Sequence, residues 1–369
     1  MKKTTKVIFH IDLNAFYASV EMILDPHLKE KVFAVGGGTN YFRSGVLTTA
    51  SYKARKYGIR SGMTVFEAYQ KYPNLIIVPN KRREYQKYSK LFFKTLKTFT
   101  THIYQASIDE AYLDVTDIID FENPLLLAKA MQEALLKHQL PASIGIAPTL
   151  FLAKMASDLK KPLGITILRK RDLKTVLYPL PVGEVHGIGV KTEERLKTVN
   201  INTIADFMNP KNKEAIIKAI GENAYWASKN DLLGKSSDFV DVHKYEIPQS
   251  ISNENTLSFD LDNRDLLKIE LAEIFNKTHQ RLKKEKLLCR SVFVKLRNNL
   301  FETKTKTKSF LKETADYELL YHTAEDLFEE LFIEEPIRLI GVGFANIIPL
   351  SDFKEERTLF NYQRLDQET

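Results

Sequence analysis

The chain has 369 residues, of which 44% are hydrophobic and 27% charged, a composition typical of a globular protein with more than one domain. No apolar run approaches the roughly 20 residues that a membrane span needs, and too few apolar residues follow the basic N-terminus for a secretory signal. The single cysteine, Cys289, cannot form an intrachain disulfide, which fits a reducing compartment. We expect a cytoplasmic protein without membrane contact, and a monomer by default.

Positive charge is concentrated in one part of the chain. The net charge is +7 and the isoelectric point about 9.0, which weakly favours a polyanionic partner. Residues 277–312 hold 12 Lys/Arg and two acidic residues, whereas residues 313–336 hold nine acidic residues and no Lys or Arg. We expect a basic face that contacts phosphates and an acidic face turned away from them. A solvated, lysine-rich surface without a partner is the alternative.

The first 170 residues alternate between strand and helix patterns. Residues 7–11 form an apolar run that predicts a buried strand ending at Asp12, and residues 16–24 have helical periodicity. Further strands are predicted over 45–49, 75–78, 103–115 (a pair interrupted at 107–110) and 142–147, and further helices over 52–57, 65–72, 83–99, 125–136 and 150–159. This interleaving favours an α+β fold around a mixed sheet.

The pattern changes after about residue 170. Residues 171–235 are predicted to be mostly helical, and the polar residues 236–245 to form a linker. An α+β pattern returns over 246–350, with strands over 291–297 and 303–308. The charged residues from 351 onwards are expected to be flexible.

Three acidic residues come together if these strands are neighbours. Asp12 ends one strand, and Asp109 and Glu110 lie between two strands almost a hundred residues later. Carboxylates that converge from adjacent strands suit Mg²⁺, and two such ions can activate a hydroxyl and stabilise a leaving phosphate. Any one of these acids alone is more often a turn or helix cap, so the pairing carries the prediction.

The two motifs resemble a known family. His10-Ile11-Asp12-Leu13-Asn14-Ala15-Phe16-Tyr17 and Ser107-Ile108-Asp109-Glu110-Ala111-Tyr112 are similar to the metal-binding motifs of Y-family, lesion-bypass DNA polymerases. The likeness covers nearly the whole chain and is strongest over 7–170. It implies an α+β multidomain fold arranged as a right hand. The implied parts are the palm over 1–16 and 83–170, the fingers over 17–82, a helical thumb with a helix-hairpin-helix over 171–235, a linker over 236–245, a DNA-binding little finger over 246–350 and a tail over 351–369.

The resemblance also assigns the catalytic residues. Asp12 and Asp109 would bind both Mg²⁺ ions, Glu110 would complete the site near the primer 3′ hydroxyl, and the Leu13 carbonyl would be a further ligand. Asn14 stands where many members have a second Asp, which leaves one fewer negative charge beside the ions. The implied activity is template-directed, error-prone DNA synthesis without proofreading, with a role in DNA damage tolerance.

Nucleotide-binding residues follow from the same resemblance. Tyr17 matches the steric gate, an aromatic ring that would clash with a ribose 2′ hydroxyl. The stretch from Thr49 to Arg55 matches the finger motif, in which Tyr52 and Arg55 share a helix face and would bind the triphosphate with Thr49. Lys161 matches a palm lysine that also reaches the phosphates.

Three further features are expected to contact macromolecules. The segment around Gly187, Gly189 and Lys191 resembles a helix-hairpin-helix whose backbone N–H groups meet a DNA phosphate. Alternation places Lys304, Lys306 and Lys308 on one strand face, where they would neutralise phosphates of primer–template DNA. Glu356-Arg357-Thr358-Leu359-Phe360 resembles a peptide that docks on the sliding clamp through Leu359 and Phe360, with Glu in place of the usual Gln.

Three other functions compete with this interpretation. A phosphatase with an Asp nucleophile normally has a second acid two residues later, and Asn14 does not fit. A catalytically silent DNA-binding protein would have no need to keep all three acids. A nucleotide cyclase with a related palm would leave the hairpin and the lysine strand without a purpose.

Overall fold

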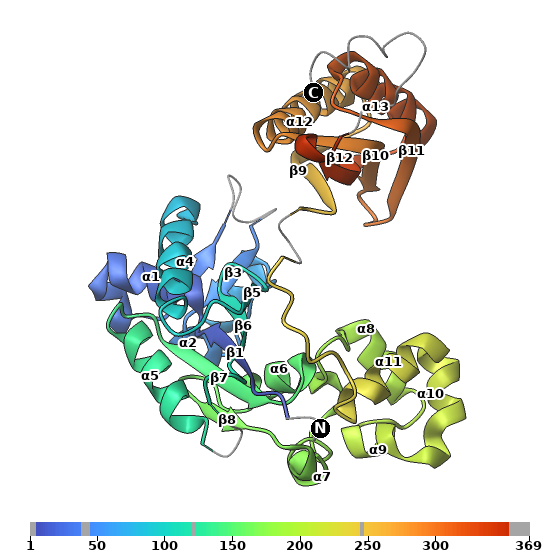
Figure 1. The fold of residues 1–369 in the computed structure, drawn as a ribbon. Coiled ribbons are helices and arrows are strands. Elements are labelled where there is room, and N and C mark those ends of the chain that lie inside the picture. The colour runs from blue at the N-terminus through green and yellow to red at the C-terminus, as the bar shows by residue number, and fades with distance from the viewer. Residues whose placement is uncertain (1–4, 38–44, 120–122, 244–246, 354–369) are drawn as a thin grey trace, which may run out of the picture. The chain divides into compact units, whose positions relative to one another are not determined.

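The computed structural model describes residues 5–37, 45–119, 123–243 and 247–353, and the chain divides after Lys244 into two compact units (Figure 1). The division falls near the end of the segment 236–245 that was predicted as a linker. The first unit contains the residues predicted as palm, fingers and thumb, and the second those predicted as little finger. The clamp-like peptide with Leu359 and Phe360 lies outside the described residues.

A five-stranded sheet forms the centre of the first unit, in the order β5-β6-β1-β7-β8. β1 (Ile8–Leu13) is the middle strand, all six of its residues are buried, and it runs antiparallel to both neighbours. The other strands are β5 (Ile103–Gln105), β6 (Glu110–Asp114), β7 (Ala142–Ala147) and β8 (Ile165–Ile167). The strand predicted to end at Asp12 is therefore present and continues one residue further, to Leu13.

Side-chain alternation along β1 separates two layers. Phe9, Ile11 and Leu13 belong to the core that includes residues of α4 (Arg82–Leu96) and α5 (Leu125–Leu136). Ile8 belongs instead to the core built with α6 (Leu150–Asp158), and His10 and Asp12 contact side chains of that helix. Because successive side chains of a strand point to opposite faces, the acid at position 12 must face α6.

The remaining elements of the first unit flank this sheet. One group, residues 16–78, comprises α1 (Phe16–Leu24), the 3-10 helix η1 (Pro26–Glu30), β2 (Phe33–Gly36), β3 (Leu47–Ala50), α2 (Tyr52–Lys56), α3 (Val65–Lys71) and β4 (Ile76–Val78), with a small sheet in the order β3-β2-β4. The other comprises η2 (Lys170–Asp172), α7 (Leu173–Val176), η3 (Val182–Glu184), α8 (Val190–Lys197), α9 (Ile204–Met208), η4 (Pro210–Asn212), α10 (Lys213–Ile220) and α11 (Glu222–Leu232). The helical second group agrees with the prediction for 171–235, and its core is continuous with that of α6.

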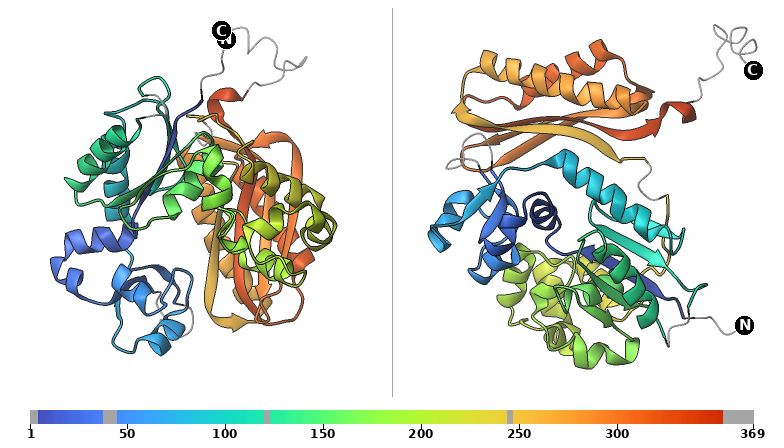
Figure 2. Two further views of the ribbon diagram at one scale, coloured as in Figure 1. Left: turned by 90° about the horizontal axis from the view of Figure 1, so that it is seen from below. Right: turned by 90° about the vertical axis from the view of Figure 1, so that its left-hand side faces the viewer.

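The second unit is a four-stranded antiparallel sheet with two helices on one face (Figure 2). Its elements are β9 (Ser250–Leu261), α12 (Arg264–Lys284), β10 (Leu287–Asn298), β11 (Thr303–Thr314), α13 (Tyr317–Leu331), β12 (Ile337–Pro349) and the 3-10 helix η5 (Leu350–Asp352), with the strands in the order β11-β10-β12-β9. Among the described residues no helix is long and apolar enough to cross a membrane. The α+β architecture of both units agrees with the predicted fold class.

Gly145 on β7 lets α6 approach the sheet closely. A Cβ atom at this position would lie 2.0 Å from the Ala153 carbonyl oxygen and 2.3 Å from the Ser157 nitrogen, both in the backbone of α6. We predict that Gly145→Ala lowers the free energy of unfolding by about 3 kcal/mol, because neither backbone can yield without moving the helix. Urea denaturation measures the change. Gly189→Ala is the control, since its Cβ would meet no atom within 4 Å; equal losses in both variants would contradict the prediction.

Candidate active site

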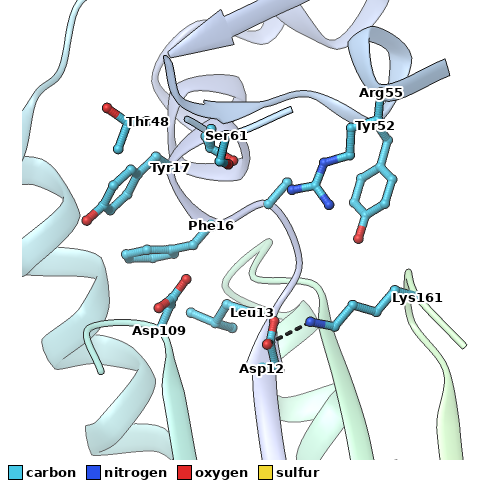
Figure 3. A pocket seen from close by; sticks show the side chains of 12 residues that line it. Asp12, Leu13, Phe16, Tyr17, Thr48, Tyr52, Arg55, Ser61, Asp109 and Lys161 are labelled. Carbon is cyan, nitrogen blue, oxygen red and sulfur yellow. Dashed lines mark hydrogen bonds and ion pairs between the residues drawn. The ribbon is translucent and has the colours of Figure 1, made fainter. Parts of the chain in front are cut away.

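A cavity of about 220 Å³ lies where β1 turns into α1. Its walls come from that turn, from β3 and α2, and from the loops before β6 and after α6 (Figure 3). The residues that line it are Asp12, Leu13, Ala15, Phe16, Tyr17, Thr48, Thr49, Tyr52, Arg55, Ser61, Asp109 and Lys161. The structure thus brings together eight of the residues that were predicted from sequence to bind metal or nucleotide, and they come from four separate stretches of the chain. Thr48 and Ser61 were not predicted.

Strand register places the three acids at one end of the sheet. Asp12 is paired with Glu110 across β1 and β6, and the Leu13 backbone N–H donates to the Asp109 carbonyl at 3.0 Å. The Asp109 carboxylate accepts a hydrogen bond from the Ser107 hydroxyl at 2.6 Å. Burial, together with the charges of Asp12 and Glu110, raises the pKa of Asp109 above its ordinary value. Asp109 is therefore a carboxylate whose negative charge is poorly compensated.

Lys154 is a functional residue that the sequence interpretation missed. It lies on α6 with 8% of its surface exposed, and its Nζ is 2.6 Å from Glu110 Oε1 and 3.2 Å from Asp12 Oδ2. Burial alone would lower the pKa of Lys154, but the nearby carboxylates of Asp12, Asp158 and Glu110 raise it. A lysine within an apolar helix pattern was the available signal, because buried lysines are almost always paired.

Lys161 has carboxylate partners in this structure. Its Nζ donates to Asp12 Oδ2 and contacts Asp158 Oδ1, each at 2.7 Å (Figure 3). The side chain also lines the cavity, as its predicted role in phosphate binding requires. Contact with a triphosphate would therefore compete with these two carboxylates.

His10 is a buried residue of β1, next to the acids, that contacts α6. Its ring is fully buried, Nδ1 is 2.8 Å from the Ser157 hydroxyl, and Nε2 is 3.8 Å from Glu110 Oε2. Burial lowers the pKa of His10, which favours the neutral ring. The hydrogen bond to Ser157 therefore ties β1 to α6, whereas Nε2 has no hydrogen-bond partner in the described parts of the chain.

Asn14 has a structural role in the turn between β1 and α1. The side chain is buried; its Nδ2 donates to the Ser143 hydroxyl at 2.9 Å, and its Oδ1 accepts from the Leu163 backbone N–H at 2.8 Å. Both the donor and the acceptor of the amide are therefore used away from the three acids. Asn14 ties the β1–α1 turn to the loop that carries Lys161.

The side of the cavity built from α2 carries donors. Arg55 stacks over the Tyr52 ring at 4.9 Å, and its Nε donates to the Ala50 carbonyl at 3.1 Å. The Tyr52 hydroxyl is buried and has no hydrogen-bond partner within the described parts of the chain. In Figure 3 it points into the cavity towards Lys161. An unpaired buried hydroxyl costs free energy, so this group is available to hydrogen-bond a ligand in the cavity.

The predicted hairpin is present, with a backbone requirement at one of its glycines. Gly187 has φ of 95°, where only glycine fits without strain, whereas Gly189 has φ of −83° and precedes α8. Lys191 is exposed in the first turn of that helix. The first N–H groups of α8 have no side-chain cap, so they remain available to an anion.

The lysines of β11 are not separated from the acidic segment as the predicted basic and acidic faces would require. Lys304 is 3.7 Å from Glu335, Lys308 is 3.8 Å from Asp326, and Lys306 is paired with Glu330. Register explains this: these lysines pair with Leu296, Val294 and Val292 of β10, whose side chains lie in the core beneath α12 and α13. The lysines therefore stand on the helix-covered face of the sheet, beside acids of α13 and the loop after it.

The opposite, open face of this sheet carries a different set of side chains, one aromatic and the others polar or charged. Phe293, Lys295 and Arg297 of β10 alternate with the buried positions and pair with Thr307, Thr305 and Thr303 of β11. Arg297 Nε donates to the Thr303 hydroxyl at 2.8 Å. This division could not be predicted from the sequence pattern, because β11 is an edge strand exposed on both faces.

Comparisons with known proteins bear on both units. The impB/mucB/samB family matches residues 11–158, its C-terminal domain matches residues 248–357, and the IMS family HHH motif matches residues 170–201. The chain is 38% identical to DNA polymerase IV of Bacillus anthracis, over 98% of this chain and 87% of that protein. It is 33% identical to DNA polymerase IV of Ureaplasma parvum, over 96% of this chain and 98% of that protein. The chain belongs to the Y family of DNA polymerases.

Solved structures of the Y family agree with this placement. A chimeric Y-family DNA polymerase superposes with a TM-score of 0.83 at 29% identity, covering 93% of this chain and 99% of that one. An insertion ternary complex of the DNA polymerase Dbh gives a TM-score of 0.66 at 27% identity with the same coverage. The resemblance stated from the two acidic motifs is confirmed. Among the described residues, no group of three or more His, Cys, Asp or Glu side chains is arranged as a metal site. Asp12 and Glu110 both contact Lys154.

We predict that Asp109→Asn stabilises the metal-free protein at neutral pH, because burial and the neighbouring carboxylates raise the pKa of Asp109 in the folded state. The variant keeps the acceptor for Ser107 but removes a charge that burial disfavours. The gain should shrink as the pH falls through the raised pKa of Asp109, since the wild-type group then becomes neutral as well. Chemical denaturation with a chelator present measures it.

Asp114→Asn is the matched control with the opposite sign. Although burial opposes the charged form, hydrogen bonds from Lys6 and Thr116 lower the pKa of Asp114. Its contribution to stability is present above the ordinary Asp pKa of about 3.9 and is lost as the pH falls through the lowered value. A stabilising Asp114→Asn, or a destabilising Asp109→Asn, would contradict this account.

Proposed function

We propose that this Y-family chain extends the 3′ end of a DNA primer with deoxynucleoside triphosphates, using Asp12, Asp109 and Glu110 to hold two Mg²⁺ ions. The observation that carries the proposal is the cavity beside β1, which has carboxylates at one side and Arg55, Tyr52 and Lys161 at another. An anionic nucleotide and divalent cations need this combination of donors and acceptors. The relatives named DNA polymerase IV support the same reaction.

The residues present fit a hard cation. Asp12, Asp109 and Leu13 line one cavity and offer carboxylate and carbonyl oxygens, which Mg²⁺ prefers. Asp109 is the acid without an ion pair in the described residues, and its raised pKa reflects a charge that a cation would compensate. When bound, Mg²⁺ would make the primer hydroxyl more acidic and neutralise charge on the phosphates. Lys154 keeps Asp12 and Glu110 close together before a cation enters.

The triphosphate fits against the α2 side of the cavity. Arg55 supplies a fixed positive charge, and the unpaired Tyr52 hydroxyl supplies a hydrogen-bond donor. α1 begins at the cavity after Ala15, which has a left-handed backbone and gives the helix no side-chain cap. The first N–H groups of α1 are thus also available to phosphate oxygens.

DNA contacts are proposed at two places. The backbone N–H groups of the hairpin around Gly187 and Gly189, together with Lys191, would bind one backbone phosphate. In the second unit, Lys304, Lys306 and Lys308 can reach phosphates only by leaving their acidic partners. On the open face of the sheet, Arg297 and Lys295 are additional candidates, although Lys295 is also paired with an acid, Glu254, at 2.8 Å.

Contact with a sliding clamp is proposed from sequence alone. Leu359 and Phe360 would fill an apolar pocket on the clamp, as anchors in a short peptide. Glu356 in place of Gln would change one hydrogen bond of that contact.

Primer extension tests the proposed activity. We predict that the full chain with Mg²⁺ copies an undamaged template and also inserts opposite an abasic site. Asp109→Ala should lower the rate by about 10³-fold or more, because several kcal/mol of charge stabilisation would be lost. Unchanged extension by Asp109→Ala would refute the assigned site. Release of phosphate from a phosphomonoester without any template would favour a phosphatase.

The sugar-selecting role of Tyr17 has its own test. Tyr17 lines the cavity, and its ring would meet the 2′ substituent of a bound nucleotide. We predict that Tyr17→Ala lowers the ratio of kcat/KM for deoxyribonucleotides to that for ribonucleotides by at least about tenfold. Single-nucleotide insertion with matched triphosphates measures the ratio. An equal effect on both sugars would show that Tyr17 is not the gate.

A further inference from the structure

A buried carboxylate that the proposed chemistry does not use lies beneath Tyr17. Glu21 is one helical turn further along α1, on the same face as Tyr17, and none of its surface is exposed. Opposite it on α4 stand Lys81, at the N-cap, and Tyr85 four residues later. Two pairs at i, i+4 spacing therefore face each other, Tyr17 with Glu21 and Lys81 with Tyr85.

Each oxygen of Glu21 has one partner. The Tyr85 hydroxyl donates to Oε1 at 2.7 Å, and the Lys81 Nζ donates to Oε2 at 2.5 Å. Tyr85 is only 1% exposed, and burial followed by the Glu21 hydrogen bond raises its pKa, so the hydroxyl remains a donor. Losing an acceptor for a buried hydroxyl is costly, which makes Glu21 a strong constraint on where the Tyr85 ring lies.

The Tyr85 ring in turn supports the gate. It stacks on Tyr17 with ring centroids 4.2 Å apart and planes inclined by 17°. Phe16 contacts the Tyr17 ring at a centroid distance of 5.4 Å. In the described parts of the chain no hydrogen bond to the Tyr17 hydroxyl is present, so packing against these two rings sets its orientation. Tyr85 is the partner that is itself fixed by a hydrogen bond.

We propose that Glu21 is a positioning residue for sugar selection. It orients Tyr85, and the stacked Tyr85 ring holds Tyr17 where a 2′ hydroxyl would clash. Lys81, whose side chain is 46% exposed, neutralises the buried carboxylate from the solvent side. This inference rests on the proposed polymerase function and on the gate at Tyr17, and it adds a determinant that does not touch the nucleotide.

The test measures the ratio of kcat/KM for deoxyribonucleotides to that for ribonucleotides in single-nucleotide insertion. Glu21→Leu removes the acceptor, and Tyr85→Phe removes the donor while keeping the ring. We expect each variant to lower the ratio by about fivefold to tenfold, the effect of one lost buried hydrogen bond. Tyr17→Ala sets the limit for complete loss of the gate. A purely structural defect would lower insertion of both sugars equally and leave the ratio unchanged.

A double-mutant cycle shows whether Glu21 acts through Tyr85. In the Tyr85→Phe background, Glu21→Leu should lower the ratio no further, because the hydrogen bond is already absent. Tyr88→Phe is the matched control, one turn further along α4 and packed on the same core but outside the cavity, and it should leave the ratio unchanged. Thermal denaturation of each variant identifies any that fail to fold, and Tyr85→Phe, which loses one oxygen, then decides the question.

The outcomes separate this inference from the proposed function. If the wild-type chain does not extend a primer, the polymerase assignment fails. If it extends primers and Tyr17→Ala admits ribonucleotides, but Tyr85→Phe and Glu21→Leu keep the wild-type ratio, the inference about Glu21 is wrong and the function stands. Additive effects in the double variant would also overturn the route through Tyr85.

Discussion

The rest of the first unit depends on one constraint, which is that two acidic side chains lie side by side on the adjacent strands β1 and β6. Asp12 and Glu110 are paired across two strands, and their repulsion is offset by the single ammonium of Lys154, which contacts both. That lysine reaches them because α6 lies close against β7, at the position where Gly145 has no side chain. The close packing of α6 on the sheet and the compensation of the two negative charges therefore both depend on the absence of a side chain at Gly145.

Buried contacts between distant elements also position the residues around the cavity. Residues near the reacting position are oriented by a layer of buried polar contacts: Ser157 and His10 behind Glu110, Asn14 beside the loop of Lys161, and Glu21 beneath Tyr85. These contacts are short hydrogen bonds between elements distant in sequence, so the cavity walls are tied to the sheet and not only to each other. A polar layer of this kind fixes geometry more strictly than apolar packing does, because each lost partner leaves a buried group unsatisfied.

Much of the site could be predicted from sequence, because Asp12, Asp109 and Tyr17 occur in short stretches whose spacing is distinctive. Lys154 was missed. A lysine within an apolar helix pattern indicates a buried partner, but nothing in the local sequence shows that the partners are two acids on adjacent strands. The ion pairs of Lys161 could not be predicted either, because they depend on which segments of the chain lie close together in the folded structure. Lys304, Lys306 and Lys308 were correctly placed on one face of a strand, but alternation alone does not say which face a helix covers. On an edge strand with both faces exposed, the apolar pattern that usually settles this is missing.

The acidic partners of the β11 lysines have a consequence for how the second unit responds to ionic strength. A free lysine that binds a phosphate displaces condensed counterions from DNA, and each such contact steepens the loss of affinity with added salt. In the proposed DNA contact, a β11 lysine would exchange its ion pair with Glu335, Glu330 or Asp326 for a phosphate, and the released carboxylate would attract cations of its own. Binding would exchange one ion pair for another at each lysine of β11. The affinity of this strand for DNA would therefore be lower, and would depend less on salt concentration, than three free lysines would give.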